Sequence, residues 1–328
     1  MTETSSQNRI SIEFAIKAAI IILLWATPAL VSKAFVGNQS SFPGLFFGFL
    51  RYLLGALSLF AIIAIRGDIK RVIVVFRHHL LGTIICAGWL ILMIIGQNFS
   101  IYFILGSSSS VLLNFNPVIV YLLAPFFFLD EQYSKVQSIA VVVSTVGIFL
   151  VFFAAVDLFV VNFNDFLLGN ALGFLSAMAW AGYTLTLRKM FSDESSEEVT
   201  SAILLLAALI LLLMSNLFEK FPPIENYSLD SIIGLIIIGV GAAGIAFTLY
   251  LQLIQKHGAT QSANIQFLIP IVSIILAWIF LGEFSFLAIT GGILCAIGVA
   301  LVTRQPVNNQ KEEKKKPGMK KAKYHLEE

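Results

Sequence analysis

Long apolar stretches recur along almost the whole chain, and they constrain its fold more than any other feature. A helix that crosses a lipid bilayer needs about 20 consecutive, mostly apolar residues. Ten stretches close to that length stand between short polar or charged clusters, at residues 14–36, 42–65, 80–103, 107–128, 136–156, 167–188, 200–218, 229–254, 260–281 and 286–303. We therefore expect an all-α integral membrane protein with ten transmembrane helices.

The composition agrees with this expectation and excludes a soluble domain. Apolar residues make up 58% of the 328 positions, and charged residues make up 12%, against roughly 25% in an ordinary soluble protein. Even a large soluble fold leaves about a quarter of its chain surface exposed, which is too much for a chain this apolar. The formal net charge of +2 is too small to indicate a nucleic-acid partner.

Lysine and arginine are divided unevenly between the two predicted sides of the membrane. Cytoplasmic loops carry the excess of these residues. With the N-terminus in the cytoplasm, eleven of them and seven more in the tail fall inside, while Lys33 and Lys220 fall outside and Arg51 lies within a helix. Both termini are therefore expected to be cytoplasmic, with residues 1–13 as a short N-terminal segment and residues 304–328 as a charged, disordered tail.

The two halves of the chain carry the same motifs at a nearly constant spacing. The matching pairs, 151 to 155 residues apart, are Trp25 with Trp180, Lys33 with Arg188, Pro117 with Pro270, Glu131 with Glu283 and Gly147 with Gly298. Five helices in each half is an odd number, so the second half is expected to cross the membrane upside down. The sequence thus predicts two inverted five-helix repeats, residues 14–157 and 165–303, an arrangement typical of alternating-access transporters.

On these motifs the chain resembles the EamA-type members of the drug/metabolite transporter (DMT) superfamily, over residues 12–303. The resemblance rests on Trp25-Ala26 with Lys33, Phe49-Leu50-Arg51-Tyr52, Pro117 to Leu129-Asp130-Glu131, Gly258-Ala259, and Pro270 to Leu281-Gly282-Glu283. It implies a ten-helix carrier with a central cavity that moves small organic metabolites, with an amino acid or a derivative as the first expectation and export as the direction. It also implies a multi-pass protein of a bacterial inner membrane.

Uncharged polar side chains recur at helical spacing on one face of the predicted fourth and ninth helices. Ser110 and Asn114 map onto Ser262 and Gln266 at an offset of 152 residues. Amides in mid-membrane are unfavourable against lipid, so they are expected to face a cavity or a neighbouring helix. The predicted cavity lining, with nearby aromatic residues included, is Trp25, Arg51, Asn98, Ser110, Asn114, Tyr121, Trp180, Tyr183, Tyr250, Ser262 and Gln266. Hydrogen bonding and packing between helices is the alternative interpretation of the same residues.

Arg51 has no counterpart in the second half, where the equivalent position is Ile203. It stands about nine residues into its helix, or ~13 Å deep at 1.5 Å per residue. An intramembrane cation is a functional candidate by default. Two interpretations stay open: pairing with a carboxylate or phosphate of a substrate, or hydrogen bonding to carbonyls of a broken helix.

Prolines and carboxylates mark the predicted hinges and caps. Pro28, Pro117 and Pro270 are expected to weaken or begin helices, and Glu131 and Glu283 to cap the helices that follow them. Proton coupling is the alternative role of these two carboxylates. No Asp or Glu falls in the middle of a predicted span, which argues against exchange of a proton for an organic cation on a central carboxylate.

Other classes of function lack their signatures. The sequence shows no metalloprotease, phosphate-loop or serine-hydrolase motif, and its four histidines and two cysteines have no ligand spacing, so we expect no enzyme, metal or cofactor. Partners are expected to be a small-molecule substrate and the bilayer, and Gly292 and Ala296 suit close packing compatible with a homodimer. Two alternatives stay open: an exchanger of a nucleotide-like or S-adenosyl-type solute, which would need several cations in its cavity, and a non-transporting membrane scaffold or assembly protein.

Overall fold

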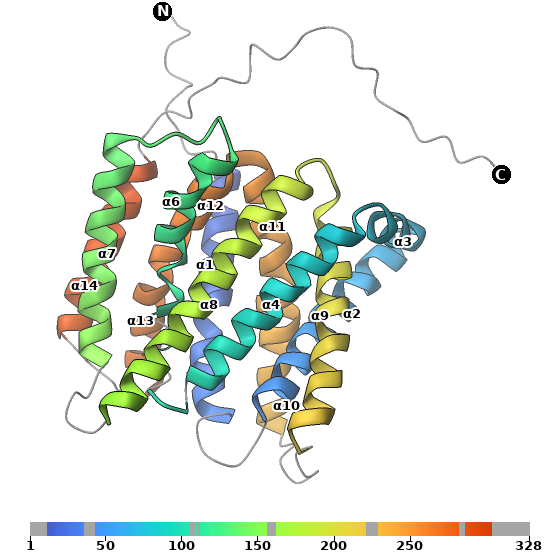
Figure 1. Cartoon of the computed structure of the whole chain (residues 1–328), viewed down its shortest axis with the longest axis horizontal. Coiled ribbons are helices and arrows are strands. Elements are labelled where there is room, and N and C mark those ends of the chain that lie inside the picture. Colours follow the sequence, from blue (N-terminus) through green and yellow to red (C-terminus); the bar gives the residue numbers. More distant parts are fainter. Residues whose placement is uncertain are drawn as a thin grey trace, which may run out of the picture.

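The computed structural model describes residues 12–35, 43–100, 102–104, 109, 112–155, 162–220, 229–281 and 286–303. Within these residues the chain forms helices and no β-strand, and the long helices run side by side in one bundle (Figure 1). The uninterrupted helices are α1 (Ile12–Phe35), α2 (Gly44–Ile65), α3 (Ile69–His78), α4 (Leu80–Ser100), α6 (Asn116–Phe127), α7 (Lys135–Ala155), α8 (Phe163–Met190), α9 (Ser196–Phe218) and α14 (Phe286–Thr303). The predicted helix bounds agree with these to within several residues, except in the fourth stretch, where α6 begins at Asn116.

Two segments change their helix type along their length. The first consists of α10 (Leu229–Ile236), the π-helix η2 (Ile237–Ile245) and α11 (Ala246–His257). The second consists of α12 (Ala259–Asn264), the 3₁₀ helix η3 (Ile265–Leu268) and α13 (Ile269–Leu281). A π-helix or a 3₁₀ stretch inside a longer helix often marks a functional position. A third break lies at the turn of Asn114 and Phe115 before α6, so the breaks before α6 and α13 fall at equivalent places of the two predicted repeats.

The outer surface of the bundle is apolar. Five of the described helices are long and apolar enough to cross a membrane, at Gly44–Ile65, Leu80–Ser100, Phe163–Met190, Ser196–Phe218 and Ile232–His257. Large side chains such as Ile65, Phe126 and Leu217 are exposed by 88%, 78% and 68%. Water would make such a surface unfavourable, whereas lipid tails solvate it. The chain is therefore an integral membrane protein.

Helix α3 is a feature that the long apolar stretches do not predict. Its ten residues are too few for a span, and only Val72 and Val75 are buried. Lys70, Arg71 and Arg77 alternate with its apolar residues. The helix therefore belongs to the predicted loop between the second and third spans.

Helices from the two halves pack against one another in matching pairs. Helix α2 packs on α9 and α7 packs on α14, and each pair joins corresponding helices of the two halves. In the same way, α4 and α6 of the first half pack on α8 of the second, and the corresponding α11 and α13 of the second half pack on α1 of the first.

The α7–α14 pair is the most extensive of these contacts, and it depends on glycine. A Cβ atom at Gly147 would lie 2.5 Å from the carbonyl oxygen of Gly291, and a Cβ at Gly291 would lie 2.5 Å from that of Gly147. Near the other end of the pair, a Cβ at Gly298 would lie 2.7 Å from the carbonyl oxygen of Ala140. The two backbones are thus in direct contact at two levels, as small residues allow in membrane helices.

Candidate functional site

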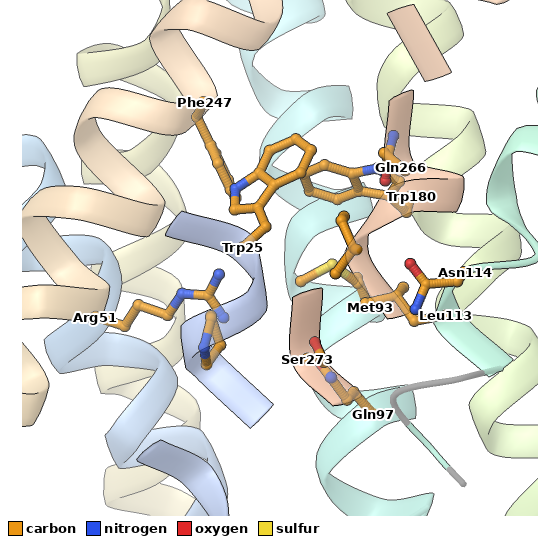
Figure 2. A pocket seen from close by; sticks show the side chains of 12 residues that line it. Trp25, Arg51, Met93, Gln97, Leu113, Asn114, Trp180, Phe247, Gln266 and Ser273 are labelled. Carbon is orange, nitrogen blue, oxygen red and sulfur yellow. The ribbon is translucent and has the colours of Figure 1, made fainter. Parts of the chain in front are cut away.

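A cavity lies inside the bundle, beside Asn114 and Gln266, two of the three predicted amides (Figure 2). Its volume is about 80 Å³, enough for several water molecules, since one water needs roughly 10–15 Å³ of such space. Its walls come from both halves of the chain, and they comprise Trp25, Pro28, Arg51, Met93, Gln97, Leu113, Asn114, Trp180, Phe247, Gln266, Ile269 and Ser273. Trp25, Arg51, Asn114, Trp180 and Gln266 of the predicted lining are thus brought together here, with the predicted hinge Pro28.

Aromatic rings form one wall of the cavity. Trp25 meets Trp180 edge-on, with ring centroids 5.2 Å apart at 84°, and Phe247 lies 5.9 and 5.2 Å from these two rings. The indole nitrogen of Trp25 donates a 3.0 Å hydrogen bond to the carbonyl oxygen of Ala242, in the π-helix η2. The indole nitrogen of Trp180 has no hydrogen-bond partner among the described residues. This wall therefore offers flat apolar surface and one spare donor.

Gln266 lines the cavity and continues into a chain of polar side chains behind the wall. Gln266 donates from Nε2 to the Tyr250 hydroxyl at 2.9 Å, and its Oε1 accepts a 3.0 Å hydrogen bond from Asn116 Nδ2. The Tyr250 hydroxyl also lies 3.0 Å from that of Thr184. Gln266 therefore combines both interpretations that the sequence left open, because it joins helices by hydrogen bonds and also faces a cavity.

Arg51 faces the cavity from the side opposite Asn114 and Gln266 (Figure 2). It is the eighth residue of α2, and only 9% of it is exposed. Its Nε has no hydrogen-bond partner, and within the described residues no carboxylate pairs with its guanidinium, which lies 5.8 Å from the centre of the Tyr52 ring. Within the described residues, no carbonyl oxygen accepts a hydrogen bond from Nε, so the alternative interpretation of Arg51, hydrogen bonding to carbonyls of a broken helix, gains no support at this atom.

The other predicted lining residues lie elsewhere. Asn98 donates to the carbonyl oxygen of Gly44 at 2.7 Å, and the Tyr121 hydroxyl lies 2.7 Å from that of Ser138. Ser262, Tyr183 and Tyr250 are fully or almost fully buried behind the cavity wall. Ser110 and Glu283 lie outside the described residues. Pro117 and Pro270 stand in the first turns of α6 and α13, immediately after the breaks.

Sequence reasoning did not select several residues of the wall. Gln97 is an amide inside an apolar helix, the same signal that selected its neighbour Asn98. Phe247 and Met93 carry no signal that separates them from lipid-facing or core residues. Ser273 was recognised on the same polar face as Ser262 and Gln266, seven residues after Gln266, but was not included in the predicted lining.

Glu131 lies at one end of the bundle, where it contacts residues of the second half of the chain. Its carboxylate accepts hydrogen bonds from the backbone N–H groups of Ala259 at 2.7 Å and Thr260 at 2.9 Å, and from the Thr260 hydroxyl. Arg188 forms ion pairs with Glu131 and, at 2.5 Å, with Asp130. We call these five residues the Glu131 cluster. Glu131 therefore caps α12. The sequence position of Glu131 had suggested that it caps α7, the helix that follows it.

Gly258 makes this arrangement possible at the junction of α11 and α12. Its φ of +90° is in the region that favours glycine. A Cβ atom at this position would lie 2.8 Å from Glu131 Oε1 and 3.0 Å from an Arg188 nitrogen. Glycine thus allows both the sharp change of direction and the close approach of the ion pair.

The chemistry available in the site is that of binding. The described residues include no group of three His, Cys, Asp or Glu that could hold a metal ion. The cavity wall contains amides, a hydroxyl, aromatic rings and one guanidinium. Such groups recognise a small molecule by hydrogen bonds, stacking and charge.

Comparison with known proteins agrees with the fold and the membrane surface. Residues 167–304 match the model of the EamA-like transporter family. This match confirms the resemblance to EamA-type transporters of the DMT superfamily, and it covers the second predicted repeat. Together with the apolar helices, the match indicates a membrane transporter of the DMT type. No curated protein sequence matches the chain.

Solved structures share the fold. Twenty-eight chains are similar. One, described as "Crystal structure of protein", has a TM-score of 0.73 and 18% sequence identity, and the match covers 88% of this chain and 98% of the other. At this identity the likeness concerns the fold alone.

Proposed function

We propose that the protein is a secondary transporter that moves a small organic metabolite, an amino acid or a derivative, out of the cell by alternating access. The observation that carries the proposal is the central cavity, whose wall includes Asn114 and Gln266 at the breaks before α6 and α13. Substrate sites of secondary transporters lie near the membrane midplane at broken helices of two repeats. Rocking of one group of helices against the other would open this cavity to each side in turn.

The proposed architecture is ten spans in two inverted five-helix repeats, residues 14–157 and 165–303. It is supported by the helix contacts, which pair α2 with α9 and α7 with α14, and in which the contacts of α4 and α6 with α8 correspond to those of α11 and α13 with α1. A two-fold relation of this kind is expected when one half is an inverted copy of the other. Both termini and α3 are proposed to lie in the cytoplasm of a bacterial cell whose inner membrane holds the protein.

Flux through liposomes tests the proposal against a scaffold. A thermal-shift screen of amino acids, nucleosides and amines on the purified protein selects candidate substrates, which are then tested by counterflow. We expect counterflow of at least one amino acid or derivative, and no loss of it when an ionophore removes the proton gradient, because no Asp or Glu is among the described residues of the cavity wall. A scaffold would move no solute, and strict dependence on the gradient would contradict the proposed mechanism.

The proposed orientation is tested by cysteine labelling in intact cells. Cysteines at Asn38 and Asn226 should react with a membrane-impermeant maleimide from outside, and one at Lys70, which is exposed on α3, only after permeabilisation. The native cysteines Cys86 and Cys295 are both buried, so they should give little background. The reverse labelling pattern would overturn the orientation.

A nucleotide-like or S-adenosyl-type solute remains the alternative substrate. A nucleotide carries several negative charges, and Arg51 is the one charged side chain among the described residues of the wall. The proposed amino acid or derivative fits this single cation better. The nucleosides in the thermal-shift screen provide the comparison.

A further inference from the structure

No described residue close to Arg51 carries a charge that balances its guanidinium. Only 9% of the residue is exposed, and its Nε lacks a hydrogen-bond partner. No ion pair to Arg51 exists among the described residues, whereas Arg188 and Arg66 each have a carboxylate within 4 Å. A buried cation without a counter-charge is unfavourable in a membrane interior. The cavity that Arg51 faces is therefore suited to an anion.

The rest of the wall indicates what the anion is attached to. Next to the guanidinium in Figure 2 stand Trp25 and, beyond it, Trp180 and Phe247. These rings offer a flat apolar surface that binds an uncharged body by stacking and burial. No carboxylate in the described wall is present to pair with an ammonium group. The wall thus recognises one negative group by charge and the remainder of the ligand by shape.

We propose that Arg51 binds the carboxylate of the transported molecule, whose apolar body lies against Trp25, Trp180 and Phe247. This assignment rests on the proposed transport function and narrows its substrate to a small organic carboxylate. Because the described cavity wall has no carboxylate that could pair with an ammonium group, the amino group of an amino acid adds little to binding. A planar fork of N–H donors matches a carboxylate in two parallel hydrogen bonds, which a single-point cation does not achieve.

Binding to the purified full-length protein in detergent tests the assignment without any need for flux. The probes are 3-phenylpropionate, its neutral amide 3-phenylpropanamide, and the zwitterion phenylalanine, followed by tryptophan fluorescence and by calorimetry. We expect the amide to bind at least about tenfold more weakly than the carboxylate, since hydrogen bonds to a charged partner are the stronger ones. Phenylalanine should bind no more tightly than 3-phenylpropionate. Equal affinity for the amide and the carboxylate would overturn the assignment.

Substitutions at two arginines, Arg51 within α2 and Arg66 at its C-cap, separate the local charge from general effects. Arg51→Gln should weaken 3-phenylpropionate at least about tenfold and leave the amide almost unchanged, while Arg51→Lys should keep part of the preference. The control is Arg66→Gln, at the exposed C-terminal end of α2, which should bind like the unchanged protein. If Arg51→Gln does not fold, Arg51→Lys and the comparison of probes on the unchanged protein still decide the question.

The remaining outcomes distinguish this assignment from its alternatives. Displacement of 3-phenylpropionate by chloride or phosphate at equal concentration would make this an inorganic-anion site and overturn the assignment. Carboxylate binding that depends on Arg51, without counterflow in liposomes, would support the site and contradict the proposed transport. Counterflow that is the same for carboxylate and amide and insensitive to Arg51→Gln would support transport and overturn the carboxylate site.

Discussion

Glu131→Ala should lower the thermal stability of the protein more than any other single substitution at the ends of the bundle. The substitution removes the acceptor of two α12 backbone N–H groups and of the Thr260 hydroxyl. It also removes the Glu131 carboxylate from its ion pair with Arg188. This pair is largely buried, because the exposed fractions of the Glu131 and Arg188 side chains are only 11% and 12%. Breaking a buried ion pair on one side costs about 3–5 kcal/mol. We expect a markedly lower midpoint of thermal unfolding in detergent, measured by the loss of the monodisperse peak in size-exclusion chromatography.

The neighbouring carboxylate provides a matched control. Asp130 also pairs with Arg188, but its side chain is 62% exposed. An exposed pair contributes about 0–1 kcal/mol, so Asp130→Asn should leave the midpoint almost unchanged. If both substitutions had the same small effect, the Glu131 cluster would not stabilise this end of the bundle.

Gln266→Ala should have the largest effect on transport, because this side chain has two roles at once. It faces the cavity, and it is the link between Asn116 and Tyr250. Its loss takes one hydrogen bond from each of these two buried side chains, while Asn116 keeps its bond to the Leu113 carbonyl oxygen and Tyr250 its contact with Thr184. The cost is about 0.5–1.5 kcal/mol for each bond lost. We expect counterflow in liposomes to fall at least about tenfold. Asn114→Ala, which also alters the cavity wall, should reduce counterflow as well.

Ser262→Ala is the control for Gln266→Ala. Ser262 stands four residues earlier in the same segment, is fully buried, lies outside the cavity wall and has no side-chain partner within the described residues. This variant should transport like the unchanged protein, and all three variants should reach the membrane in similar amounts. Equal loss of Gln266→Ala and Asn114→Ala protein from the membrane, with unchanged transport per molecule, would leave the amides a structural role only.

Hydropathy predicted the helices well because lipid imposes long apolar stretches on any chain that crosses it. The helix bounds at α2, α7 and α14 lie within two residues of the predicted ones. The π-helix η2 was not predicted, because no side-chain pattern distinguishes nine apolar and small residues in a π-helix from the same residues in an α-helix. Helix α3 was not predicted either, since a search for spans overlooks an amphipathic helix of ten residues.

The residues that face the cavity were predicted in part: Ser262 of the repeated polar pattern lies outside the wall, whereas Arg51, which has no counterpart in the other half, faces the cavity. Asn114 and Gln266 occupy equivalent positions and both face the cavity. Gln97 and Asn98 are adjacent amides, about 100° apart around their helix, and only the rotation of α4 in the assembled bundle brings Gln97 to the wall. The sequence also placed the cap of Glu131 on the wrong helix. Its partners on α12 are 128 and 129 residues away, so only the assembled bundle brings them to this carboxylate.

The glycine contacts of α7 with α14 limit how the two halves can move. Backbones that touch at Gly147 and Gly291, and again at Gly298, leave no layer of side chains that could yield or slide between them. We therefore expect these two helices, one from each half, to stay in contact while the proposed transporter changes shape. The other helices would then rotate about the α7–α14 contact, and the two halves would not separate along their whole length.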